Sequence, residues 1–65
     1  MAHDLTRRPP INVARAAQYL GTSERHVRRL WAERRLTGIK LGGKLLFDPS
    51  ELDAFLERNT VAAVR

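Results

Sequence analysis

The clearest hydrophobic periodicity lies in the middle of the chain. Val27, Leu30 and Trp31 recur at the i, i+3 and i+4 spacing that forms one apolar stripe on a helix. Ser23 stands before this stripe and is a favourable N-cap, because its hydroxyl can accept from a free backbone N–H. The pattern therefore predicts a helix that begins after Ser23.

The opposite face of this predicted helix is basic. At about 100° per residue, Arg25 and Arg29 point almost opposite the apolar stripe, and Arg28 lies on its flank. Glu24 and Glu33 are spaced to pair with Arg28 and Arg29, which relieves only part of the repulsion. A helix that is fixed to a core on one side and carries arginines on the other is suited to bind a polyanion.

A second amphipathic helix is predicted just before it. Asn12 is the expected N-cap, and Gly21 ends the helix because glycine accepts the left-handed conformation. Its apolar stripe consists of Val13, Ala16, Ala17 and Leu20. Since only Gly21 and Thr22 separate the two helices, they must turn sharply against each other. This is the layout of a helix-turn-helix, although ordinary helical hairpins look similar.

After the second helix, expected to end near Arg34 or Arg35, residues 39–47 predict a β-hairpin. Gly42-Gly43 is the turn signal, and Lys40 is expected on the outer face. The residues expected to face inward are Ile39, Leu41, Leu45 and Phe47. A lone hairpin is marginal in water, so this one must pack against the helices.

This hairpin is either a plain structural element with solvated lysines or a wing that grips a phosphate backbone. Lys44 lies beside the two turn glycines, and glycine lets a backbone approach a partner closely. We favour the wing because a basic helix precedes it.

A third helix is predicted to begin with Asp48 as the N-cap and Pro49 at the first helical position. Its mostly acidic outer face is interpreted as solvated, since nothing pairs these carboxylates with a nucleophile or a metal cluster. Tyr19 is expected to be half buried, and Trp31 is expected to anchor the core, not to stack on a base. The predicted core comprises Val13, Ala16, Ala17, Leu20, Val27, Leu30, Trp31, Leu36, Ile39, Leu41, Leu45, Phe47, Leu52, Phe55 and Leu56.

Charge is distributed unevenly along the chain, whose formal net charge is +5. Residues 22–44 contain seven basic and two acidic residues, whereas residues 48–58 contain one basic and four acidic residues. One face of the molecule is therefore expected to attract phosphates.

Composition excludes several classes of site. With 65 residues the chain is expected to form one domain, and without cysteine it has no disulfide or thiolate metal site. No apolar run is long enough for a membrane span or a signal peptide, so we expect a cytoplasmic protein with no membrane partner. We also expect no cofactor, no metal and no enzymatic activity.

The expected organisation is an arm, a domain and a tail. Residues 1–10 are a flexible basic arm, which is either a disordered leader or a DNA contact. Residues 11–58 form the DNA-binding domain. Residues 59–65 form a short tail that extends the last helix, frays or contacts a neighbouring protein.

Taken together, these elements resemble the winged helix-turn-helix of the MerR-like superfamily, and in particular the small phage excisionases. The matching segments are AQYLGTS at residues 17–23, the basic helix at 24–34, the wing at 39–44 and DPSELDAFL at 48–56. Thr22 departs from the β-branched apolar residue common in the family, and Arg15 replaces an acidic residue. The implied fold is α+β and mostly helical, with a two-stranded wing.

The resemblance implies an architectural protein that binds and bends double-stranded attachment-site DNA and directs a phage integrase toward excision. It also implies contacts with the integrase or with further copies in tandem on DNA. MerR-type regulators add a long dimerisation helix and an effector region, for which this chain leaves no room. A small MerR-like transcriptional regulator is the alternative, and a protein-interaction adaptor or antitoxin is the second.

In the DNA-binding hypothesis, the second helix enters the major groove and arginines read guanine edges. His26 contacts DNA or is an uncommitted surface residue. The predicted contacts from the helix-turn-helix are Thr22, Ser23, Arg25, His26, Arg28 and Arg29. Those from the wing are Lys40, Gly42, Gly43 and Lys44, with the two lysines on the flanking backbone or in the minor groove. Further candidate phosphate contacts are Arg7, Arg8, Arg15, Arg34 and Arg35.

Overall fold

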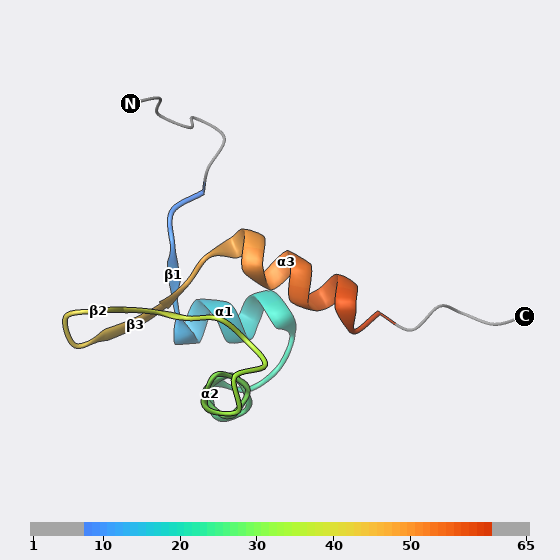
Figure 1. The fold of residues 1–65 in the computed structure, drawn as a ribbon, viewed down its shortest axis with the longest axis horizontal. Helices are drawn as coiled ribbons and strands as arrows, with labels where there is room; N and C mark the ends of the chain where they lie inside the picture. The colour runs from blue at the N-terminus through green and yellow to red at the C-terminus, as the bar shows by residue number, and fades with distance from the viewer. Residues whose placement is uncertain (1–7, 61–65) are drawn as a thin grey trace, which may run out of the picture.

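The computed structural model describes residues 8–60, which form three helices and three strands (Figure 1). The helices are α1 (Val13–Leu20), α2 (Glu24–Ala32) and α3 (Pro49–Arg58), and the strands are β1 (Ile11–Asn12), β2 (Ile39–Leu41) and β3 (Lys44–Phe47). The predicted α+β winged helix-turn-helix is confirmed. Its sheet has one strand more than predicted, because β1 joins the hairpin.

All three helices begin at the predicted N-caps. In each case the capping side chain accepts a hydrogen bond from a backbone N–H in the first turn, which satisfies one of the donors that a helix start leaves free. The acceptor–donor pairs are Asn12–Arg15 at 2.8 Å, Ser23–His26 at 3.1 Å and Asp48–Ser50 at 2.9 Å.

The end of α1 is closed by two reversed hydrogen bonds around Gly21, whose φ is 71°. The N–H of Gly21 donates to the carbonyl of Gln18, and that of Thr22 donates to the carbonyl of Ala17. This is the Schellman arrangement, which requires a left-handed residue. The sequence-based prediction that Gly21 ends the helix is confirmed.

The end of α2 has the same hydrogen bonds without a glycine. Arg34, with a φ of 61°, donates from its N–H to the carbonyl of Trp31, and Arg35 donates to that of Leu30. The helix therefore stops at Ala32, short of the predicted end near residues 34–35. Sequence propensity misses this stop because arginine is a good helix former and seldom adopts a positive φ.

The core surrounds α1, which contacts α2, α3, β1 and β3. Figure 1 shows α2 end-on below α1, with the β2–β3 hairpin and α3 extending in opposite directions. The buried apolar residues are Val13, Ala16, Ala17, Val27, Leu30, Leu36, Leu45, Phe47 and Leu52. Ile11, Leu20, Trp31 and Phe55 are partly buried against this cluster.

Two residues predicted in the core are exposed: Leu41 is 63% exposed and Leu56 is 39% exposed. The other predicted core residues that are not fully buried are intermediate, namely Leu20, Trp31, Ile39 and Phe55. Tyr19, expected to be half buried, is 40% exposed. Leu56 lies near the C-terminal end of α3.

The register of the sheet explains the error at Leu41. The strands are antiparallel in the order β1-β3-β2, with Lys40 opposite Leu45 and Leu41 opposite Lys44. Residues directly opposite in an antiparallel pair share a face. Because Leu45 is buried, Lys40 shares the inner face of the hairpin and Leu41 the outer face, the reverse of the prediction for both residues.

The positive φ of Arg34 predicts that Arg34→Gly stabilises the fold. Glycine adopts this conformation without the steric penalty of a Cβ, so the free energy of unfolding should rise by about 0.5–1 kcal/mol. Urea denaturation followed by circular dichroism measures the change. The reverse substitution at the matching position, Gly21→Ala, should lower the free energy of unfolding by about 1 kcal/mol. A loss of stability in Arg34→Gly would contradict the prediction.

Candidate nucleic-acid interface

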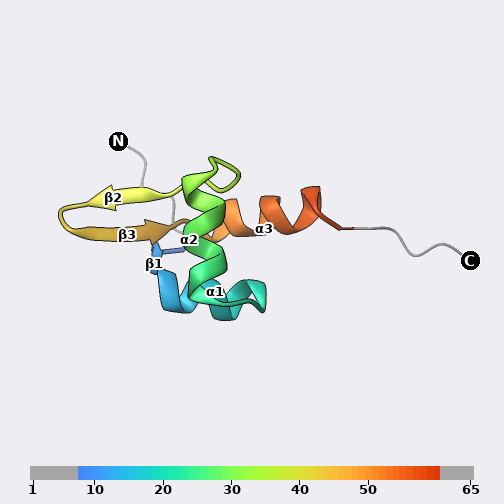
Figure 2. The same ribbon diagram turned by 90° about the horizontal axis from the view of Figure 1, so that it is seen from below.

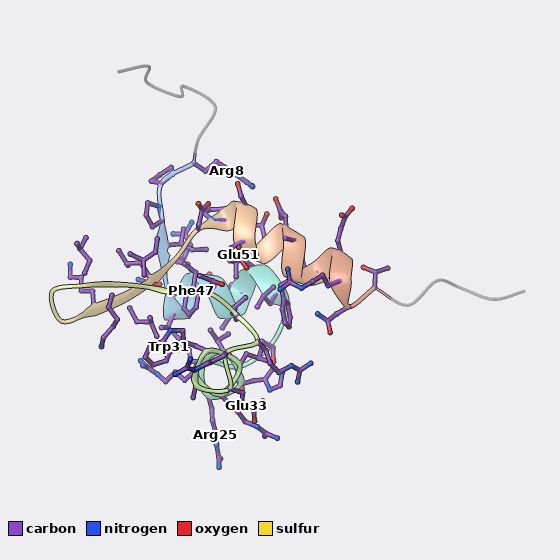
Figure 3. All side chains as sticks on the ribbon, viewed as in Figure 1. Arg8, Arg25, Trp31, Glu33, Phe47 and Glu51 are labelled. Carbon is purple, nitrogen blue, oxygen red and sulfur yellow. The ribbon has the colours of Figure 1, made fainter. Side chains whose placement is uncertain are left out.

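The outward face of α2 carries exposed arginines. Figure 3 shows Arg25 extending away from α1 and α3 into solvent. Arg29 is paired with Glu33 at 3.4 Å, a contact that is weak because both side chains are largely exposed. Within residues 8–60, neither Arg25 nor Arg28 has a carboxylate within ion-pair distance, so their charges are available to a polyanion.

The start of α2 is suited to a phosphate. Ser23 caps the helix, and the first two N–H groups of α2, those of Glu24 and Arg25, lack intrahelical partners by their position. The helix dipole adds positive potential at this end. Thr22 and Ser23 are exposed beside it, as is His26 on the neighbouring flank.

A groove of about 640 Å³ separates α2 from the hairpin. One row of α2 side chains, from Glu24, Arg28 and Trp31, lines one side, and Lys40 and Lys44 lie on the other. Figure 2 shows α2 upright beside the hairpin, which projects past it. The groove therefore brings together charges from α2 and the wing that the sequence placed in separate elements.

Trp31 connects the wing to α2. Its ring lies 5.8 Å from the Lys40 Nζ, within the range of a cation–π contact. Its indole also packs against Gly38, where an added Cβ would lie 2.8 Å from the Trp31 Cδ1. A residue with a side chain at position 38 would have to displace the ring, so Gly38 permits the wing to begin close to α2.

The acidic residues are concentrated on α3, away from the arginine face. Figure 3 places Glu51 on α3, whereas Arg25 extends from α2 in the direction away from α3. Glu51 lies 4.0 Å from Arg58, whose guanidinium also stands over the Phe55 ring at 5.9 Å. This separation of charge keeps most of the carboxylates from repelling a phosphate held by α2.

Arg8 is engaged with α1 and α3. Its Nη2 donates to the Asp53 Oδ2 at 2.6 Å, and its Nη1 donates to the Tyr19 hydroxyl at 3.2 Å. The Tyr19 hydroxyl in turn donates to the other oxygen of Asp53. The bonds from Tyr19 and then Arg8 hold the pKa of Asp53 below its ordinary value, because both favour the charged carboxylate.

The other candidate phosphate contacts lie apart from the groove. Arg15 is exposed on α1 and lines a hollow of about 480 Å³ with Pro9, Ile11 and Tyr19. Arg34 and Arg35 line another hollow, of about 380 Å³, together with Arg58. Arg7 lies outside the described residues, as do most of the predicted arm and tail.

Sequence reasoning missed two features of this region, the Arg8–Tyr19–Asp53 cluster and the packing of Trp31 on Gly38. The cluster joins residues that are far apart in the chain, so no local sequence pattern predicts it. The glycine offered a weak signal, since it follows a helix and precedes a strand. Of the predicted α2 arginines, Arg28 lines the groove together with Lys40 and Lys44 of the wing, whereas Arg25 and Arg29 do not line it.

Two kinds of site are not found in the described part of the chain. None of the helices formed by residues 8–60 is long and apolar enough to cross a bilayer. The same residues contain no group of three or more histidine, aspartate or glutamate side chains placed to hold a metal ion.

The hydrogen bonds to Asp53 predict a pH-dependent contact. Because the folded-state pKa is lowered, the contact stabilises the fold above the unfolded pKa near 3.8 and is lost as the pH falls through the lowered value. Carbon-detected NMR titration should give an Asp53 pKa below 3.8, and Tyr19→Phe should raise it. Arg25→Ala, on the opposite side, should leave it unchanged. An unshifted Asp53 in the wild-type protein would contradict the geometry.

Comparison with known proteins places the chain in a family. A family model described as a helix-turn-helix domain matches residues 11–60, from β1 to just beyond α3. No curated protein and no solved structure matches the chain. The matched domain occurs in excisionase-like proteins, is typically non-enzymatic and implies binding to double-stranded DNA. The chain therefore belongs to the helix-turn-helix domain family of DNA-binding proteins.

Proposed function

We propose that this protein is a sequence-specific architectural protein of the excisionase kind. It binds and bends attachment-site DNA in a bacterial cell and directs a phage integrase toward excision. The observation that carries the DNA-binding part is the groove between α2 and the wing, around which Arg28, Lys40 and Lys44 lie together. The excisionase part rests on the resemblance of the motifs and on the occurrence of the matched domain in excisionase-like proteins.

The groove suggests a division of roles. Arg25, Arg28 and Arg29 enter the major groove, where arginine pairs with the O6 and N7 atoms of guanine. The start of α2 binds a phosphate, and Lys40 and Lys44 bind the flanking backbone. The acidic face of α3 points away from DNA and remains available to a protein partner, such as the integrase or a further copy.

The domain organisation proposed from the sequence is retained. Residues 11–58 form the DNA-binding domain, residues 1–10 an N-terminal arm and residues 59–65 a tail. Arg8 at the end of the arm is held by Asp53, so a DNA contact from Arg8 requires that ion pair to open.

Footprinting distinguishes this function from its alternatives. On DNA of the source replicon with excess random competitor, the protein should protect repeated short sites beside an attachment core. Phased hypersensitive cuts between these sites should report a bend. A single protected promoter would instead make the protein a transcriptional regulator. Binding that competitor removes, with no footprint, would refute sequence-specific recognition and favour a protein partner for the basic face.

Substitutions in the groove separate base contacts from phosphate contacts. Arg28→Ala should cost about 1–3 kcal/mol on the protected site and less on random DNA, because it removes a base contact. Lys44→Ala should weaken binding to all sequences alike. About five phosphate contacts predict a log–log salt slope of roughly −4 to −5, which Lys44→Ala should reduce by about 1. The control Arg58→Ala removes one positive charge from α3, as the other substitutions do from the groove, and should leave the affinity for DNA unchanged. If Arg28→Ala instead weakens binding equally on both DNAs, Arg28 contacts a phosphate and not a base.

A further inference from the structure

The tip of the wing carries an apolar side chain that the fold does not use. Leu41 is 63% exposed, which makes it more exposed than Tyr19 or Leu56, the other exposed large hydrophobic residues of the described chain. The register fixes this position, since Leu41 pairs with Lys44 at the solvent end of the hairpin. Leaving a leucine in water gives up the free energy of its burial, so a partner that covers it would gain this energy.

The surroundings of Leu41 indicate the chemistry of that partner. Lys44 stands directly opposite on the same face, and Lys40 precedes Leu41 on the other face, beside Trp31. The sequence contains no acidic residue between Glu33 and Asp48. An apolar contact flanked by lysines matches DNA, in which phosphates border the less polar sugars and base edges of a groove.

The shape of the tip favours the minor groove. Gly42 and Gly43 form the two-residue turn, and a Cβ at either position would meet no atom within 4 Å. The tip is therefore a bare backbone on which Leu41 and Lys44 are the first side chains. The minor groove is only about 6 Å wide, so a narrow tip can enter it where a bulkier one cannot.

We propose that Leu41 enters the minor groove beside the site bound by α2 and wedges against a base step, with Lys40 and Lys44 on the phosphates at either side. Apolar wedges of this type unstack a base step and bend the duplex away from the minor groove. This inference rests on the proposed DNA-binding function and deepens it, because it names the residue that produces the bend. It also gives the outer face of the wing a role distinct from base reading by α2.

The test uses the protected DNA fragment and the full chain. Leu41→Ala should bind it about ten-fold more weakly and bend it less, as measured by energy transfer between dyes at the DNA ends. Leu41→Met retains an apolar side chain of similar volume and should restore both. Leu56→Ala, a matched removal of an exposed leucine on α3, should behave like the wild-type protein. Thermal denaturation shows that each variant folds.

A modified DNA locates the contact. Replacing adenine by 2,6-diaminopurine in the flank under the wing adds an amino group to the minor groove and leaves the major-groove edge unchanged. The wild-type protein should lose about ten-fold in affinity, while Leu41→Ala should lose little further. Equal losses for both proteins, or wild-type binding and bending by Leu41→Ala, would overturn the inference while leaving the proposed function intact. A wild-type protein without any footprint would instead overturn the proposed function, and this inference with it.

Discussion

The structure depends on how closely its elements pack against α1. Ala16 and Ala17 are almost completely buried on this helix, and their small side chains let α2 approach. The connection between the two helices consists of a few residues around Gly21, so it offers no slack if the helices are pushed apart. Larger side chains at these positions would force such a displacement. Because α3, β1 and β3 also contact α1, the separation between α2 and the wing is set by packing on this third element.

The local features of the fold were predictable because their causes are local. Asn12, Ser23 and Asp48 each bond to a backbone N–H two or three residues away, so a short stretch of sequence contains the whole interaction. The register of the wing was not predictable in this way. The short strands allow either face to be turned inward, and burial of Phe47 opposite Ile11 selects one of them. The strand β1 was missed for a related reason, since two residues are too few to show a period.

The candidate site likewise has local features, which the sequence predicted, and features set by tertiary packing, which it did not. Helical periodicity was sufficient to place Arg25, Arg28 and Arg29 on or beside the outward face of α2. The contact between Lys40 and Trp31, by contrast, depends on how the hairpin packs beside the helix, which no pattern within either element specifies. The lysine was assigned to the outer face because the alternation in β2 was read with the opposite phase. Local chemistry thus indicated which residues are candidates for DNA binding, and tertiary packing decided how they are arranged.

The pairing of β1 with β3 has a consequence for how the chain folds. Ile11 lies opposite Phe47, so this pair closes a loop that contains α1, α2 and β2. Contacts between α1 and α2 form over a short stretch of chain, whereas the sheet must first overcome the entropy of closing the long loop. During synthesis on a ribosome, the two helices emerge before Phe47 does, and β1 must wait unpaired until β3 follows. The N-terminal segment can therefore be anchored only after β3 has formed, and this pairing closes a longer loop than the contacts between α1 and α2 do.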